Sequence, residues 1–132
     1  MKKLNCILLI DDDESTNRFH EIIIKQINLT DTVVKAKNGK GALDVLTNPK
    51  NSIEPDLIFL DLNMPVMDGF RFIELYTGTK NFKEKRPKIV VLSTSLIDEE
   101  KEKIESNDEI DMFLNKPLTK KRIANLMTNF WQ

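Results

Sequence analysis

Three short segments of the chain are apolar at every position instead of alternating with polar residues. They are residues 6–10 (CILLI), 57–60 (LIFL) and 89–92 (IVVL). Strands that are apolar on both faces are typical of a parallel sheet that helices cover on both sides. Two more polar segments, 32–36 and 110–114, complete the set, and their polarity suits the edges of such a sheet.

Helical periodicity fills the intervals between these segments. The spacing of apolar residues predicts helices over 15–27, 39–47, 68–76, 98–105 and 119–130. We expect a Ser or Thr as N-terminal cap near Ser15, and further caps at Asp98 and Thr119. The regular alternation predicts five βα units, and hence an α/β fold with a doubly wound, five-stranded parallel sheet. Right-handed crossovers then bring the carboxyl ends of all the strands to one edge, where α/β proteins hold their sites.

Composition indicates one folded unit. The 132 residues match a typical single domain of about 100–150 residues, and 40% hydrophobic with 31% charged residues is a globular mix. Twenty basic and twenty-one acidic residues give a net charge of −1, so nothing global favours nucleic acid or an anionic membrane as partner. We expect a single domain over residues 1–132 without an output domain. We also expect a cytoplasmic location, because no run approaches the roughly 20 apolar residues that span a bilayer.

Polar residues follow four of the predicted strands at the point where each strand ends. In chain order these groups are Asp11–Glu14, Asp61 with Asn63, Ser93–Ser95, and Asn115 with Lys116. Two carboxylates about 4 Å apart repel by about 4 kcal/mol at an effective dielectric near 20, so converging carboxylates need positive charge. Lys116 supplies one charge, and a hard cation that prefers oxygen ligands, Mg²⁺ or Mn²⁺, would supply two more. Carboxylates, a divalent cation and a lysine together indicate phosphoryl transfer onto an aspartate.

The same segments resemble the receiver domain of two-component response regulators over essentially the whole chain. The matching stretches are ILLIDDDES at 7–15, AKNGKGAL at 36–43, DLIFLDLNMPVMDGF at 56–70, VVLSTS at 90–95 and FLNKPL at 113–118. The third stretch is the most specific, because an Asp after an apolar strand is followed at fixed spacing by Asn-Met-Pro and Met-Asp-Gly. The resemblance implies a flavodoxin-like (βα)5 sandwich.

The resemblance also implies a role for each site residue. Asp61 would be the phosphoacceptor, and the metal would be held by Asp12 directly, by Asp11 through water, and by Asp61. The other implied roles are the main-chain carbonyl of Asn63 as a metal ligand, Ser93 as the switch hydroxyl, Phe113 as the switch aromatic, Lys116 as the site lysine, and a cis bond between Lys116 and Pro117. Thr94 departs from the family, which often has Ala there.

The function that the resemblance implies is a signalling switch. A sensor histidine kinase or a phosphotransfer protein would phosphorylate Asp61, and the surface formed by 98–105, 110–114 and 119–130 would change to alter partner binding or form a homodimer. We expect no enzyme activity beyond its own phosphorylation and dephosphorylation. Two alternatives stay open: a phosphatase of the haloacid dehalogenase type with Asp11 as nucleophile, and a receiver-like interaction domain that is not phosphorylated.

Three other features have simpler interpretations. His20 lies on an apolar helical face, which predicts a packed or half-exposed histidine and no phosphohistidine. Phe19 falls one residue off that face, which fits equally a docking anchor for the phosphodonor or a contact with a neighbouring loop. The basic residues of the interval before the fourth strand are expected to form a solvated loop, with a docking patch for an anionic partner as the alternative: Lys80, Lys83, Lys85, Arg86 and Lys88.

Overall fold

The computed structural model describes residues 2–94 and 96–131. Its strands are β1 (Ile7–Ile10), β2 (Val33–Ala36), β3 (Leu57–Asp61), β4 (Lys88–Ser93) and β5 (Met112–Asn115). Its helices are α1 (Glu14–Gln26), α2 (Gly39–Thr47), α3 (Gly69–Thr77), α4 (Lys80–Lys85), α5 (Asp98–Glu105) and α6 (Lys120–Trp131). Among these described residues, no helix has the length and apolar character that crossing a bilayer requires.

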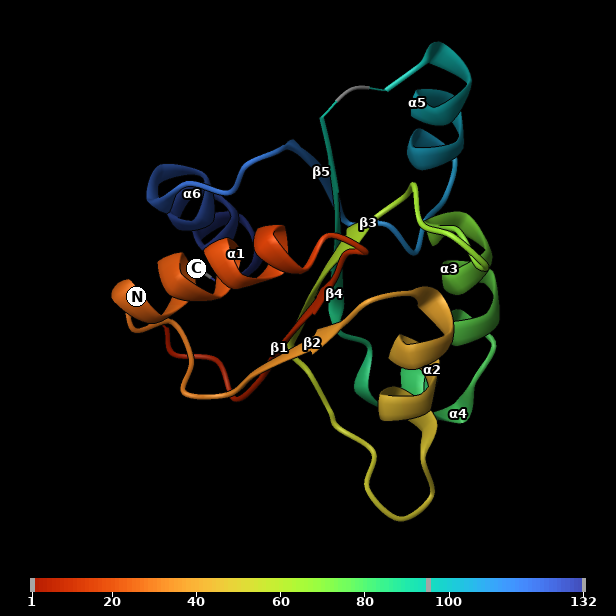
Figure 1. Ribbon diagram of the computed structural model, residues 1–132, viewed down its shortest axis with the longest axis horizontal. Helices are drawn as coiled ribbons and strands as arrows, with labels where there is room; N and C mark the ends of the chain where they lie inside the picture. The colour runs from red at the N-terminus through yellow and green to blue at the C-terminus, as the bar shows by residue number, and fades with distance from the viewer. Residues whose placement is uncertain (1, 95, 132) are drawn as a thin grey trace.

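The five strands form one parallel sheet in the order β2-β1-β3-β4-β5. Helices α1 and α6 cover one face, and α2, α3 and α5 lie on the other (Figure 1). This arrangement confirms the predicted doubly wound α/β fold, with β2 and β5 at the edges as expected. The direction of winding reverses between β1 and β3, which makes the carboxyl ends of these two strands the place where such folds bind ligands.

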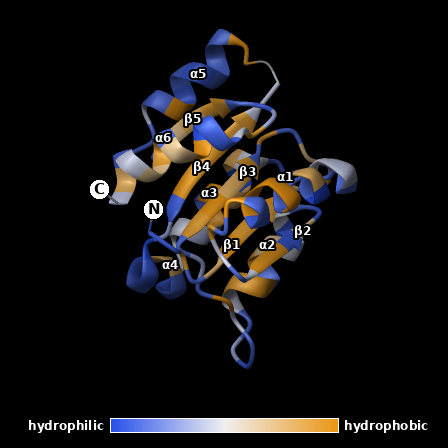
Figure 2. Cartoon of the chain, turned by 90° about the vertical axis from the view of Figure 1, so that its left-hand side faces the viewer, coloured by the Kyte–Doolittle hydropathy of each residue, from blue (hydrophilic) through white to orange (hydrophobic). Residues whose placement is uncertain are grey.

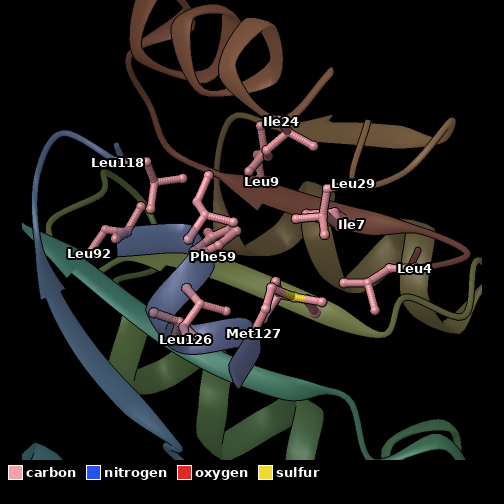
Figure 3. Close-up of a cluster of buried hydrophobic side chains, with 13 residues drawn as sticks. Leu4, Ile7, Leu9, Ile24, Leu29, Phe59, Leu92, Leu118, Leu126 and Met127 are labelled. Atoms are coloured by element: carbon pink, nitrogen blue, oxygen red, sulfur yellow. The ribbon is translucent and has the colours of Figure 1, made fainter. Parts of the chain in front are cut away.

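The absence of polar alternation in the central strands follows from this layering. In β1, Ile7 and Leu9 point into the core under α1 and α6, whereas Leu8 and Ile10 point into the core on the other face. All four side chains are fully buried. The strands are accordingly the most uniformly hydrophobic part of the chain in Figure 2, and Figure 3 shows the first core between the sheet and the two helices.

The interval before β4 differs from the prediction of a loop, because residues 80–85 form the short helix α4. Thr79 caps it by accepting the Phe82 N–H at 3.2 Å. Phe82 is buried edge-on against Tyr76, with ring centroids 5.3 Å apart. With a single apolar residue in six positions, this helix has no periodicity that a sequence pattern could reveal. Its packing on an aromatic ring of α3 supplies the stability that the pattern lacks.

Of the basic residues of this interval, Lys80, Lys83 and Arg86 are exposed as expected, but several of the five lie close to acidic side chains. Lys85 lies 2.8 Å from the partly buried Asp56 carboxylate, and Arg86 lies 3.3 Å from Glu109. Lys80 and Lys88 have acidic partners too, in Glu84 and Asp111 respectively. Nearby acids therefore neutralise most of this cluster, which weakens the interpretation of it as a docking patch for anions.

Two of the three expected helix caps were wrong. Helix α1 is capped by Asp13, not by a Ser or Thr, and the N-cap of α5 is Ile97, not Asp98. The Ile97 N–H donates to the carboxylate of Glu100, three residues later, at 3.2 Å. This contact stabilises the start of α5 although Ile97 has no polar side chain. Thr119 is confirmed as a cap of α6, since its hydroxyl accepts the Arg122 N–H at 3.1 Å.

His20 is packed, which decides between the packed and half-exposed arrangements that the sequence allowed. It is 1% exposed, and its Nε2 accepts the Leu118 N–H at 3.3 Å. The pKa of His20 is lowered to about 4, chiefly by burial; the negative charge of Asp11 opposes this effect, and the positive charge of Lys116 adds to it. The imidazole is therefore neutral in the folded protein at pH 7 and free to accept a hydrogen bond.

This burial predicts a pH-dependent loss of stability. Between pH 6.5 and about pH 4, His20 is protonated in the unfolded chain but neutral in the folded protein. The free energy of unfolding should therefore fall by about 2 kcal/mol more between pH 7 and pH 5 than in His20→Gln, which has no titrating group there. Urea unfolding of both proteins at several pH values measures the difference, and parallel pH profiles would contradict it.

Candidate functional site

Two carboxylates meet at the point where the sheet changes direction. Strands β1 and β3 pair with Ile10 beside Leu60, so the next residues, Asp11 and Asp61, end neighbouring strands side by side. Both are buried polar residues, at 4% and 7% exposure. Parallel pairing at a switch point thus buries two acids close together, as the strand-end pattern predicted.

Hydrogen bonds and a cation fix the Asp11 carboxylate from two sides. Its Oδ1 accepts the Asp13 N–H at 2.9 Å, and its Oδ2 lies 2.6 Å from the Lys116 Nζ. Asp13 in turn caps α1 by accepting the N–H of Ser15 and the hydroxyl of Thr16. The turn after β1 is therefore ordered by its own acidic residues, and Asp11 is aimed at the lysine.

Lys116 directly follows β5, the strand at one edge of the sheet, and its side chain reaches back to the carboxylates at the central strands β1 and β3. Its backbone N–H donates to the Ser93 carbonyl at 2.9 Å, which extends the pairing of β4 and β5 by one step. Its ammonium lies 3.6 Å from Asp61 Oδ2 in addition to the closer contact with Asp11. One mostly buried cation thus serves two buried carboxylates, and the peptide bond between Lys116 and Pro117 is cis, as the family resemblance implies.

The charges at this site are not balanced by the lysine alone. The pKa of Asp61 is raised, chiefly because burial disfavours the ionised form; Lys116 opposes this effect, and Asp11 and Asp12 reinforce it. Neighbouring negative charge and low solvation both favour the arrival of a further cation.

The donor atoms suit a hard divalent cation. One carboxylate oxygen from each of Asp11, Asp12 and Asp61 lies within 4.8 Å of the others, and Asp12 is exposed to solvent. Three carboxylates without nitrogen or sulfur donors match the preference of Mg²⁺ and Mn²⁺. The exposed side of the cluster leaves coordination positions for water or a phosphoryl oxygen.

The loop after β3 is folded back onto the strand that it leaves. The Gly69 N–H donates to the Leu62 carbonyl at 2.9 Å. A Cβ on Gly69 would lie 2.8 Å from the Leu62 Cα and 2.9 Å from the Asp61 carbonyl oxygen, so only glycine allows this approach. The Asn63 N–H donates to Asp61 Oδ1 at 3.3 Å. The specific spacing of this motif therefore has a steric reason, and it keeps Asn63 beside the central carboxylate.

The remaining predicted residues lie around this centre. Ser93 is buried at the end of β4, and Thr94 is exposed beside it, whereas Ser95 lies outside the described residues. Phe113 is partly buried and packs with the cluster that holds Ile104 of α5. Phe113 thus connects β5 to a helix whose other core contacts are few.

A shallow hollow opens next to the lysine. Its volume is about 320 Å³. Phe19 forms part of its rim and is 47% exposed, which makes it one of the few large apolar side chains open to solvent among the described residues. The hollow is lined by Ser15, Thr16, Phe19, His20, Thr94, Lys116 and Pro117.

Asn17 is a buried polar residue of α1 that the sequence patterns did not single out. Its Nδ2 donates to the main-chain carbonyls of Asp11, at 3.1 Å, and Ala36, at 3.3 Å. A signal was present, because Asn17 precedes His20 by three positions on the face that also carries Ile24. A polar residue on an apolar helical face needs a buried partner.

Comparison with known proteins gives a consistent result. Residues 7–128 match the family described as response regulator receiver domain. The two-component response regulator ARR22 of Arabidopsis thaliana is 36% identical, over 98% of this chain and 86% of its own length. The protein PilG of Pseudomonas aeruginosa is 28% identical over 89% of this chain and 80% of its own.

Solved structures agree on the fold. A two-component response regulator from Cytophaga hutchinsonii superposes with a TM-score of 0.85 at 28% identity, over 97% of both chains. One from Legionella pneumophila gives 0.80 at 31% identity, over 95% of this chain and 96% of its own.

Proposed function

The chain belongs to the response regulator receiver domain family, and from this premise we propose that it is a signalling switch phosphorylated on Asp61. A phosphohistidine on a sensor kinase or phosphotransfer protein would be the donor. The Asp61 carboxylate oxygen would form a bond to phosphorus while the N–P bond of the donor breaks. The electron pair of the broken N–P bond would stay on the imidazole nitrogen of the donor. Among the relatives, an autoinducer 1 sensor kinase/phosphatase of Vibrio harveyi is 27% identical over 94% of this chain, which spans 13% of that protein.

One observation carries this proposal: the Lys116 ammonium lies 2.6 Å from Asp11 and 3.6 Å from Asp61. A cation in that position can bind a phosphoryl oxygen as soon as the oxygen arrives on Asp61. Of the two buried carboxylates, Asp61 lies farther from the Lys116 ammonium. Among the described contacts, its side chain accepts one backbone N–H, that of Asn63. Of the two buried carboxylates, Asp61 is therefore the more available to react.

We propose that Mg²⁺ or Mn²⁺ is held by Asp12 directly, by Asp11 through water, by Asp61, and by the main-chain carbonyl of Asn63. The oxygen-only donor set and the raised pKa of Asp61 support this assignment. When bound, such an ion supplies charge neutralisation at the transferring phosphoryl group.

The contacts of Asp11 weigh against the phosphatase alternative. A nucleophilic Asp11 would have to attack with a carboxylate whose two oxygens already accept the Asp13 N–H and face Lys116. The alternative of an unphosphorylated interaction domain does not explain the acidic cluster and the mostly buried lysine. Burying these charges costs desolvation free energy, which such a domain would have no reason to spend.

We propose that the donor protein docks across the hollow beside Lys116. Phe19 is an aromatic side chain exposed on its rim, and such residues often anchor protein interfaces. The donor histidine would then approach Asp61 from the side of α1.

We propose that phosphorylation of Asp61 changes the surface formed by α5, β5 and α6, and that Ser93 and Phe113 transmit this change. The Ser93 hydroxyl would turn toward a phosphoryl oxygen, and Phe113 would move further into the core. A charge-assisted hydrogen bond gives about 1.5–3 kcal/mol, whereas moving a population from 1:99 to 99:1 takes about 5.5 kcal/mol. Contacts of Lys116 and burial of Phe113 must therefore contribute as well.

The face that would respond consists of α5, β5 and α6. Helix α5 carries five acidic and two basic side chains, and α6 begins with Lys120, Lys121 and Arg122. Figure 2 shows α5 as a predominantly hydrophilic helix at one end of the molecule. Opposite charges on neighbouring elements could pair across a two-fold axis, so we propose this face for a homodimer or for a downstream partner.

The chemistry predicts a clear difference between the two buried aspartates. Asp61→Asn should abolish labelling by acetyl phosphate in the presence of Mg²⁺, because the nucleophile is gone. Asp11→Asn should only slow labelling, because it weakens the cation site. Labelling is measured on denaturing gels or by intact mass, with chelation of Mg²⁺ as a control that should stop it. Labelling that survives in Asp61→Asn but not in Asp11→Asn would favour the phosphatase alternative.

Docking through Phe19 predicts a loss that depends on the donor. Phe19→Ala should slow transfer from a phosphorylated histidine protein about tenfold, as removal of an interface anchor does, and leave acetyl phosphate labelling unchanged. Ile97→Ala is a matched control, since Ile97 is also a large exposed apolar residue but lies at the start of α5. An equal loss with both donors in Phe19→Ala would show that Phe19 supports the site and not the interface.

The switch predicts that Ser93→Ala separates phosphorylation from its effect. Labelling of Asp61 should persist, but the response of residues 98–122 to beryllofluoride, a phosphoryl mimic, should shrink to less than half. Backbone NMR shifts with and without the mimic measure this response. Full-sized shifts in Ser93→Ala would mean that the hydroxyl is not the coupling element.

A further inference from the structure

Helix α1 carries a short buried polar edge on the face that it turns toward the sheet. Asn17 and His20 are 3% and 1% exposed and lie three residues apart, so both point to the same side of the helix. Their neighbour on that face, Ile24, is part of the apolar core. Burying an amide and an imidazole costs free energy unless each has a partner. The partners that they have are backbone groups of the loops that carry the site.

Asn17 binds the ends of two strands at once. Its amide donates to the carbonyls of Asp11 and Ala36, the residue that ends β1's edge neighbour β2. The Asp11 N–H also donates to the Ala36 carbonyl, at 3.1 Å. The main chain of Asp11 is therefore held at both its N–H and its C=O, which leaves its carboxylate little freedom to turn away from Asp61.

His20 binds the turn that follows β5. Its Nε2 accepts the N–H of Leu118, which is fully buried and lies two residues after Lys116. The Arg122 guanidinium donates to the Pro117 carbonyl at 2.8 Å in the same turn, but it is exposed on the outer side. His20 is thus the inner anchor of the turn that presents the lysine.

We propose that Asn17 and His20 are positioning residues that divide the site between them: Asn17 sets the metal carboxylate Asp11, and His20 sets Lys116. The proposal rests on the proposed function, since it assigns these residues to the Mg²⁺ site and to the phosphoryl-binding lysine. It assigns no contact with reacting atoms to either residue. In this proposal, helix α1 fixes the positions of the ends of β1 and β2 and of the turn after β5 relative to one another.

The division predicts that each residue has its own signature. Asn17→Leu keeps the size of the side chain but donates no hydrogen bond, so the Mg²⁺ dissociation constant should rise about tenfold, the loss typical of groups that orient metal ligands. Labelling by acetyl phosphate should recover once Mg²⁺ is raised to saturation. NMR titration with Mg²⁺ alone, followed at the Asp13 and Asn63 amides, measures the affinity.

His20→Leu should give the opposite pattern. Its Mg²⁺ affinity should stay within about twofold of wild type, while labelling at saturating Mg²⁺ should fall about tenfold because the lysine is misplaced. His20→Gln keeps an acceptor for the Leu118 N–H and should restore most of the rate. The Leu118 amide shift reports the hydrogen bond directly, and it should move in His20→Leu and return in His20→Gln.

Each variant is the control for the other, because both remove one buried polar group from the same helix. Urea midpoints establish that the metal-free variants are folded, and His20→Met replaces His20→Leu if the latter does not fold. Equal losses of Mg²⁺ affinity and of labelling rate in both variants would overturn the proposal and indicate a general structural role. Unchanged values in both would overturn it too. An unlabelled wild-type protein would count against the proposed function alone, because the Mg²⁺ titration and the Leu118 shift need no phosphorylation.

Discussion

The structure depends on how it keeps two carboxylates buried at the end of an apolar sheet. Asp11 and Asp61 end neighbouring strands whose other residues are entirely apolar, so little solvent is at hand to support their charge. The Lys116 ammonium is the compensation within the described residues, and it arrives from a strand two positions further along the sheet. Removing one partner of such a buried pair costs about 3–5 kcal/mol, because the other charge is left uncompensated. One lysine beside three carboxylates leaves the charge incompletely balanced, which favours a further cation.

The two faces of the sheet serve this centre differently. Helices α1 and α6 share a continuous core with the sheet, from Leu4 to Met127, and this core fixes the position of α1 (Figure 3). Helix α5 is attached more weakly, since Ile104 is its only buried residue among those described. Lys103, over the ring of Phe70 at 5.3 Å, adds a contact to α3. This difference in packing between the two faces supports the proposed switch, in which the loosely attached α5 side responds.

The loop after β3 shows strain concentrated near the site. Val66 has a φ of 70° and is 90% exposed, a costly conformation for a β-branched residue. Gly69 allows the loop to return against Asp61 and Leu62 a few residues later. The close approach keeps Asn63 next to Asp61, and the Asn63 N–H donates to the Asp61 carboxylate.

The sequence by itself determined the sheet, its layers and the residues that converge at its edge. Uniformly apolar strands require a covered parallel sheet, and parallel strands with right-handed crossovers leave their polar ends no other place to meet. Helix α4 and the caps of α1 and α5 did not follow from the pattern, because Phe82 on Tyr76 and Glu100 on the Ile97 N–H are single contacts without periodicity. The tertiary structure alone decided which partners the buried polar groups take. Lys116 pairs with Asp11 across 105 residues and His20 with Leu118 across 98, and such pairings depend on distances that no local pattern encodes.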